Sequence, residues 1–238
     1  MFKTAVPTEK AEQTRREIFD TALLVFREKG FDASSMREIA ARAGVALGAA
    51  YYYFPSKEAI IQAYYGVVQS EHERLVLATF FDPRLTLKQR LQFAIQSKLD
   101  ILQHDRKLLG VIFRYSGEPD HPLSCLGPGT EPARHASMAI FSRAVENEKL
   151  PDDLRELLII AMWALHMGVL ILFLYDNSPR QRRTRRLVDG AVELAAGFLS
   201  VARSPLLKPW RRRVLALLRD ADLLSDLETL EKGGNHGG

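Results

Sequence analysis

The sequence of 238 residues predicts an all-α protein. Apolar residues recur at helical spacing in one segment after another, and no stretch of any length alternates as a half-buried strand would. Two pairs, Ser35 with Glu38 and Thr86 with Gln89, have the S/T-x-x-E/Q spacing of a capping box. Glycines and prolines separate the segments, as expected for helices joined by short turns. We therefore expect a bundle of helices.

The composition is that of a soluble globular protein that can bury a core, with 47% hydrophobic and 26% charged residues. The length suits one large or two small domains. Cys125 is the one cysteine, so an internal disulfide is impossible and a reducing compartment is compatible. The first residues lack the pattern of a secretory signal, which predicts a cytoplasmic protein. A net charge of +4 permits nucleic-acid binding without predicting it.

The helical segments follow one another along the chain, with a loop rich in glycine and proline at 117–132. A loose arm at 1–8 and a frayed tail at 233–238 are expected at the ends. We expect helices over 8–29, 36–43, 47–53, 57–80, 86–104, 107–115, 133–146, 152–175 and 178–202, and a last amphipathic helix after Pro209.

The segment 35–58 organises the rest of the chain. Its first helix begins at Met36 and ends before Gly44, where a positive φ is needed. A second short helix follows from Leu47 and stops at Pro55, and Ser56 can cap the next helix. A helix, a tight turn and a second helix make a helix-turn-helix, whose second helix enters the DNA major groove.

This segment closely resembles the DNA-binding motif of the TetR family of transcriptional regulators, of the TetR/AcrR type. The matching residues form one run: Ile39-Ala40, Ala43-Gly44-Val45, Gly48, Tyr51, Tyr53-Phe54 and Ser56-Lys57-Glu58. The resemblance implies a three-helix DNA-binding head at 1–66 and a larger helical domain at 67–238 that binds an effector and makes a homodimer.

The residues that would read DNA follow from the same match. Arg37 is the one long donor with a bidentate option, so it contacts either a guanine or a phosphate. Leu47 and Ala49 would make apolar contacts with the bases, while Gly48, which has no side chain, would let the backbone come close to the DNA. The remaining candidates are Tyr51, Tyr52, Tyr53 and Lys57, the last two for phosphates. The head carries nine basic and eight acidic residues through position 66, so phosphate attraction depends on local placement.

The sequence departs from the usual family pattern at Ala46 and Ala49, where a small polar residue is common. The missing hydroxyls place the N-cap and phosphate contacts at these positions in question.

The stretch 157–175 is almost continuously apolar, and its length approaches a membrane span. A helix that is apolar all round is also expected when it is buried by its own core and by a partner. His166 within it and the flanking acids favour the second interpretation. The order of helices and the segment LFLYDNSPRQRRTRRLVD resemble the C-terminal domain of one TetR subgroup. We therefore expect a homodimer through 154–175 and 178–202, and no membrane span.

An effector pocket could be lined by the aromatic and polar residues Phe113, Tyr115, Trp163, His166 and Phe173. For each of them a place in the ordinary core is the alternative. We expect an apolar or amphipathic effector. The arginines of 180–186 could form a nucleic-acid patch, but a solvated helix face is the preferred interpretation.

Catalysis has little support in the sequence. The six histidines lack the spacing of metal ligands, and Cys125 has no identifiable base beside it. No glycine loop for phosphate binding is present. We therefore expect no enzyme, no cofactor and no metal.

The sequence predicts a ligand-responsive transcriptional regulator, a repressor that binds a palindromic operator as a homodimer and is released by a small molecule. That mechanism is implied by the resemblance. The alternative is a helical small-molecule-binding protein that does not bind DNA.

Overall fold

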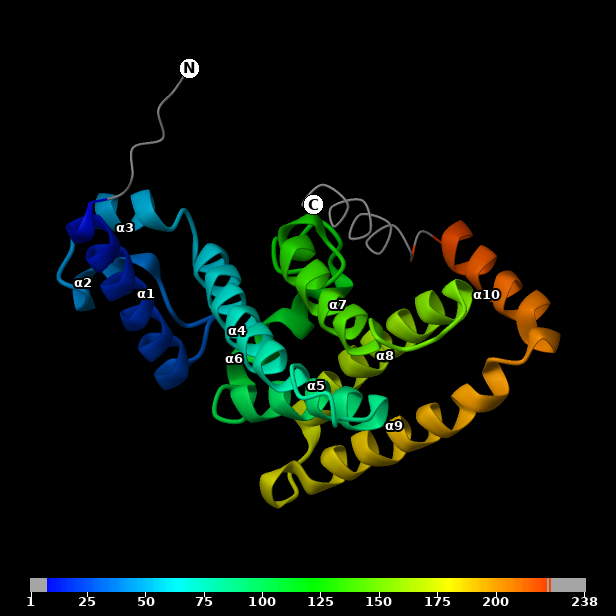
Figure 1. The fold of residues 1–238 in the computed structure, drawn as a ribbon. Helices are drawn as coiled ribbons and strands as arrows, with labels where there is room; N and C mark the ends of the chain where they lie inside the picture. Colours follow the sequence, from blue (N-terminus) through cyan, green and yellow to red (C-terminus); the bar gives the residue numbers. More distant parts are fainter. Residues whose placement is uncertain (1–7, 222, 224–238) are drawn as a thin grey trace. The chain divides into compact units, whose positions relative to one another are not determined.

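The computed structural model describes residues 8–221 and 223, and every regular element within this part of the chain is a helix (Figure 1). The all-α prediction is confirmed. Of the arm predicted at 1–8, only Thr8 is described, as the N-cap residue of α1, and the tail predicted at 233–238 lies outside the described residues. The chain divides into two compact units, residues 1–65 with 107–130 and residues 66–106 with 131–238.

The first unit contains three complete N-terminal helices, the beginning of a fourth, and nearly all of α6 (Arg106–Arg114). The bounds of the first four helices are α1 (Glu9–Lys29), α2 (Met36–Arg42), α3 (Leu47–Tyr53) and α4 (Lys57–Phe80). Gly30 ends α1 with a φ of +89°, which is accessible to glycine at little cost. The next residue, Phe31, turns back under the helix and packs its ring 5.3 Å from that of Phe26. The core of the unit contains Ile18, Phe26, Ile39, Phe54 and Ile60.

The segment after α6 (Arg106–Arg114) is held against α4 within this unit. It contains two 3-10 turns, η1 (Tyr115–Gly117) and η2 (Pro128–Thr130), where the sequence predicted only loop. Gln62 of α4 donates to the carbonyl oxygen of Pro122 over 2.8 Å. A Cβ at Gly129 would lie 2.4 Å from that same carbonyl oxygen, so only glycine fits there.

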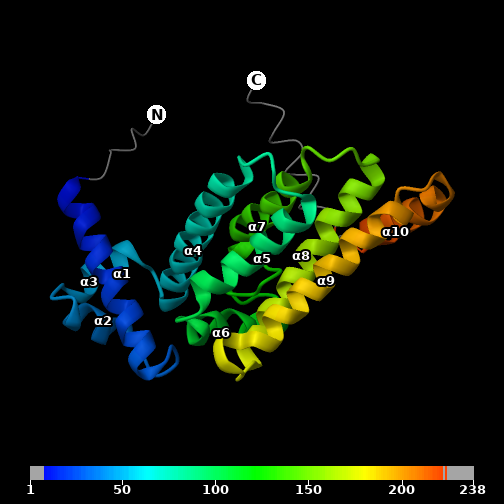
Figure 2. The same cartoon turned by 60° about the horizontal axis from the view of Figure 1, so that its bottom comes forward.

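The second unit is a helical bundle that contains the C-terminal part of α4. Its other elements are α5 (Leu87–Leu102), α7 (Glu131–Val145), α8 (Asp152–Tyr175), α9 (Arg182–Ala202), the 3-10 turn η4 (Pro205–Leu207) and α10 (Lys208–Asp220). The predicted capping box at the start of α5 is formed in both directions between Thr86 and Gln89. Helix α5 packs against α7 and α9, and α8 packs against α7, α9 and α10 (Figure 2).

Helix α8 is long and apolar enough to cross a membrane, with a mean hydropathy of 2.6 over its most apolar window. Nearly half of that window, 44%, is buried inside the protein. The buried side includes Leu158, Met162, Val169 and Phe173. Since the core helix of a soluble protein has the same composition, the length of α8 alone does not indicate a span.

The start of α9 differs from the prediction of a helix beginning at Ser178. Pro179–Gln181 form a 3-10 turn, η3, in which Arg180 and Gln181 have φ values of +53° and +52°. The carboxylate of Asp176 accepts hydrogen bonds from the backbone N–H groups of Ser178 and Thr184, at 2.9 and 2.8 Å, and from the Thr184 hydroxyl. Asp176 therefore fixes the left-handed turn, and the α-helix begins only at residue 182.

Replacing Asp176 by alanine is expected to lower the free energy of unfolding by about 1–2 kcal/mol, because three hydrogen bonds at the start of α9 lose their acceptor. Burial opposes ionisation of this carboxyl, but the bonds from Ser178 and Thr184 hold its pKa well below its usual range. The group therefore stabilises the fold above the ordinary aspartate pKa and loses that contribution as the pH falls further.

Urea denaturation at pH 7 measures this change. The exposed Asp220→Ala on α10 is the matched control and should leave the midpoint unchanged. Equal effects of the two substitutions would contradict the capping role of Asp176.

Candidate nucleic-acid interface

The turn between α2 and α3 is set by one glycine. Gly44 has a φ of +68°, as the sequence predicted, and the next residue, Val45, donates its N–H to the carbonyl oxygen of Ala40 over 3.0 Å. At the other end of α2, the Ser35 hydroxyl accepts from the Glu38 N–H over 3.2 Å. The Glu38 carboxylate is directed at Lys29 and Arg42, so it serves ion pairs within the head.

Helix α3 has one buried residue, Ala50, and leaves the rest of its surface open. Gly48 is exposed, Tyr51 is half exposed, and Tyr52 is 83% exposed. The ring of Tyr52 meets that of Tyr53 edge to face at 5.1 Å. A short helix with an aromatic and glycine surface is thus presented to solvent, as expected of a recognition helix.

Arg37 is exposed on α2, and no acidic partner for it is found among residues 8–221. Arg42, one turn later, pairs with Glu28 at 2.5 Å. The contrast matters because an arginine without an internal ion pair keeps all of its donors for a base or a phosphate.

Lys57 is more engaged than the sequence suggested. Its ammonium donates to the carbonyl oxygen of Phe31 over 2.9 Å and lies 4.5 Å from the centre of the Phe31 ring. These contacts fix the start of α4 to the turn after α1. A phosphate contact by Lys57 stays a prediction, and it would have to use the remaining hydrogens of the ammonium.

The N-terminus of α3 confirms what the alanine at position 46 implied. Ala46 is the N-cap residue, and no side chain caps the helix there. Leu47 and Ala49, the predicted apolar contacts, are partly exposed beside it.

The predicted pocket residues fall into different units. Phe113 and Tyr115 belong to the first unit, where the ring of Tyr115 stacks on His121 with centroids 3.7 Å apart. Trp163, His166 and Phe173 lie on α8 in the second unit. The structure brings Tyr115 against the residues of the head, and a shared pocket for all five stays a prediction.

His166 belongs to a buried polar cluster that the sequence did not reveal. Its ring lies 6.3 Å from that of His72 on α4, and the two planes are nearly parallel. The Nε2 of His72 donates to the carbonyl oxygen of Ala94 over 2.8 Å. On α5, Lys98 donates to the side-chain oxygen of Gln69 over 2.9 Å. We call Gln69, His72, Lys98 and His166 the Lys98 cluster.

The electrostatics of the Lys98 cluster are unusual for a protein core. Burial lowers the pKa of Lys98 to about 7. Burial and the charge of Lys98 lower the pKa of His72 to about 3, against the opposing effect of the Ala94 bond. Burial, His72 and Lys98 also hold the pKa of His166 well below its ordinary value. No described carboxylate acts on any of these three groups, so the cluster contains basic groups without an acidic partner among the described residues.

A periodicity argument could have found Lys98. It lies seven residues after Leu91 and three after Ile95, on the face that the sequence assigns to the core of α5. Gln69 and His72 are likewise three residues apart, which places them on one face of α4.

Comparison with known proteins agrees with this arrangement. Residues 18–64 match the family "Bacterial regulatory proteins, tetR family", and residues 90–210 match the family "Tetracyclin repressor-like, C-terminal domain". The second match alone covers half of the chain. The protein belongs to the TetR family. Its members are transcriptional regulators and not enzymes, so the chain is a DNA-binding regulator with a helical ligand-binding C-terminal domain.

Two curated relatives show how far the likeness extends. The transcriptional activator FasR of Mycolicibacterium smegmatis is 28% identical over 193 residues, which are 79% of this chain and 84% of FasR. The regulator SrpR of Pseudomonas putida is 33% identical over 109 residues, 45% of this chain and 49% of SrpR.

Solved structures share the fold at low identity. A TetR regulator from Nitrosomonas europaea gives a TM-score of 0.63 with 22% identity, covering 77% of this chain and 98% of its own. The regulator FadR of Bacillus subtilis, solved in complex with stearoyl-CoA, gives 0.60 with 18% identity over 74% and 96%.

The single substitutions Gly44→Ala and Gly48→Ala should separate an effect on folding from an effect on DNA binding. A Cβ meets nothing within 4 Å at either site, so any effect of Gly44→Ala comes from its left-handed backbone. We expect Gly44→Ala to lower the free energy of unfolding by about 1 kcal/mol. Gly48→Ala should not destabilise the helix, but the added methyl should weaken DNA binding.

Chemical denaturation and DNA-binding titrations on the two variants check this pair. Loss of stability in Gly48→Ala, or none in Gly44→Ala, would show that the turn and the recognition helix have been assigned wrongly.

Proposed function

We propose that the protein is a cytoplasmic repressor that binds a palindromic operator as a homodimer and releases it when a small-molecule effector binds the C-terminal domain. The proposal places the DNA-binding head at 1–66 and the effector and dimer domain at 67–238. The observation that carries it is the surface of α2 and α3, where Arg37 and Tyr52 are exposed and Gly48 is open.

This surface supports DNA reading for a physical reason. The head is nearly neutral, so bulk charge supplies little of the affinity, and direct contacts from a few residues have to supply the rest. A single seven-residue helix covers few base pairs. Two heads on a two-fold axis double the contacts, which is why a palindromic site and a dimer are proposed together.

An exposed apolar stripe on α9 supports the dimer. Its members recur at helical spacing on one side of the helix while Val188, Val192 and Leu199 face inward. The exposed members are Leu187, Leu194, Phe198 and Val201. Ile171, Leu172 and Tyr175 of α8 are also exposed. Contiguous apolar surface of this kind is typical of an interface between protein chains.

The effector is proposed to shift the separation of the two heads, so that both can no longer fit their half-sites. FadR, which shares the fold, was solved with a ligand that joins a long acyl chain to a charged carrier, which supports an amphipathic effector. Repression is proposed because blocking a promoter requires no contact with another protein. FasR is an activator, so activation is the opposite outcome of the transcription assay.

Arg37→Ala should weaken operator binding by about 1–3 kcal/mol if Arg37 reads a guanine, and should relax the preference at that base pair. If Arg37 contacts a phosphate, the variant should lose affinity for all sequences alike. The slope of log affinity against log salt concentration should then decrease by about one. Fluorescence anisotropy on duplexes from the region upstream of the gene measures both quantities.

Tyr53→Ala tests the second predicted DNA contact, and Arg74→Ala on α4 is the control, since Arg74 pairs with Glu71. The control should bind as the wild type does. A wild-type protein that binds no such fragment more tightly than random duplex would instead favour a helical small-molecule-binding protein.

Phe198→Asp should convert the dimer to a monomer and reduce operator affinity more than tenfold, because a charge at the centre of the stripe would be buried without a partner. Sedimentation velocity measures the mass. Ser200→Asp introduces the same charge on the opposite, exposed side of α9 and should leave the dimer intact. A dimer that survives Phe198→Asp would place the interface elsewhere.

A further inference from the structure

The Lys98 cluster has the properties of a binding site and lacks those of a structural core. All four side chains are at least nine-tenths buried, with 6% of Gln69, 1% of His72, 6% of Lys98 and 1% of His166 exposed. They come from α4, α5 and α8, and the ring of Phe141 on α7 lies 5.7 Å from that of His166. Four helices of the second unit therefore surround these polar groups.

Several polar atoms of the cluster have no partner among the described residues. They are the side-chain nitrogen of Gln69 and the Nδ1 atoms of His72 and His166. Buried polar groups are nearly always hydrogen-bonded, because an unmade bond costs roughly 1–3 kcal/mol. Three such atoms in one place leave hydrogen-bonding capacity for a bound group.

Lys98 determines which charge the missing partner should carry. Among the described residues its ammonium donates to the neutral amide of Gln69, and no described carboxylate acts on it. A buried ammonium without a counter-ion is costly, and bringing a negative charge beside it removes that cost. The Gln69 amide nitrogen is a further donor, while His72 and His166 stay neutral because their pKa values are lowered.

We propose that the Lys98 cluster binds the anionic head group of an acidic, amphipathic effector, with Lys98 as its counter-ion and the Gln69 amide as a donor. This rests on the proposed ligand-responsive function and specifies the chemical class of the ligand. The apolar part of the effector would lie among the apolar side chains of the surrounding helices. A carboxylate and a phosphate share the required chemistry.

Anion binding should be coupled to proton uptake. Free Lys98 is mostly neutral at pH 8, because burial lowers its pKa to about 7. A bound anion restores the charged form, so uptake should approach one proton per ligand at this pH. The titratable groups that act on one another here are Lys98 from α5, His72 from α4 and His166 from α8, and Phe141 of α7 does not titrate.

The test is isothermal titration calorimetry of the full chain without DNA, at pH 8 in two buffers of different ionisation enthalpy. The probes are octanoate, octyl phosphate, 1-octanol and octylamine. We expect octanoate or octyl phosphate to bind about tenfold or more tightly than 1-octanol, with proton uptake. Which of the two binds more tightly identifies the head group as carboxylate or phosphate. Octylamine should bind least.

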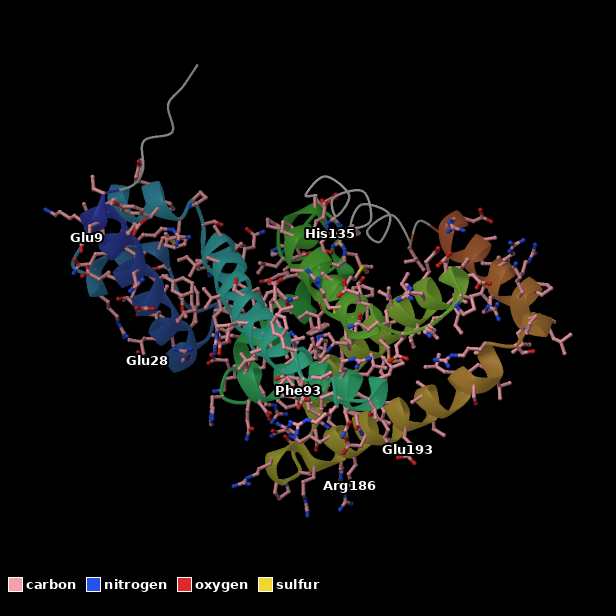
Figure 3. All side chains as sticks on the ribbon, in the orientation of Figure 1. Glu9, Glu28, Phe93, His135, Arg186 and Glu193 are labelled. Carbon is pink, nitrogen blue, oxygen red and sulfur yellow. The ribbon has the colours of Figure 1, made fainter. Side chains whose placement is uncertain are left out.

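Lys98→Met should abolish both the preference for the anion and the proton uptake. The variant should fold, and its melting temperature should exceed that of the wild type most below pH 7. The difference should shrink as the pH rises toward the ordinary lysine value, where both states of the wild type are neutral. Lys88→Met, at a half-exposed site on the same helix where Lys88 pairs with Glu193 of α9 (Figure 3), is the control and should keep both properties.

Three results would overturn the proposal: no binding of either anion at millimolar concentration, equal binding of octanoate and 1-octanol, or a Lys98→Met variant that keeps the preference. Because DNA is absent, this outcome is independent of the operator assay. A regulator whose effector is neutral would bind the operator in the DNA assay but would show no preference for the anion in the calorimetric titration.

Discussion

The left-handed turn at Gly44 is the constraint on which the reading surface depends. It ends α2, and the bond from Val45 to the carbonyl oxygen of Ala40 fixes the direction in which the chain leaves. Helix α3 then buries only Ala50, so its stability comes from this turn and from its neighbours more than from its own packing. Because of this turn, α3 is a short helix with nearly all of its surface available for contact.

A head of this kind has consequences for the rest of the chain. With a nearly neutral charge and no side-chain cap on α3, each head offers a small number of contacts. Useful affinity therefore requires two heads on one DNA molecule. In the proposed dimer the apolar surfaces of α8 and α9 would pair the heads, because α9 is apolar toward its own core and also toward solvent. Helix α8 also carries His166, so the proposed dimer contacts and the Lys98 cluster share one element.

Local signals made much of the fold predictable. The capping residues Ser35, Ser56 and Thr86 and the glycine at position 44 act within a few residues, and the helices beginning at 36, 47, 57 and 152 start where the sequence placed them. The start of α9 was missed for the opposite reason. Arg180 and Gln181 adopt a left-handed conformation because Asp176 accepts one hydrogen bond from Ser178 before them and two from Thr184 after them, and no propensity of those two residues indicates it.

The candidate sites were predictable to different degrees. Arg37 and the tyrosines of α3 could be read from the sequence because a motif fixes their positions on two short helices. The Lys98 cluster could not, since it joins residues of three helices that are far apart in the chain. Periodicity places Lys98 on an apolar face, but only the fold shows that none of the described carboxylates acts on it. Tyr115 and the residues of α8 belong to different units, an assignment that the sequence did not indicate.

The proposed function requires two copies of the head to read one DNA site. Hydroxyl-radical footprinting of the wild-type protein on the region upstream of its gene measures this. A homodimer on a palindromic operator should give two protected half-sites related by a two-fold axis on one face of the duplex, with centres about 34 Å apart or a multiple of that distance. A single protected patch, or uniform protection that depends on charge alone, would contradict it.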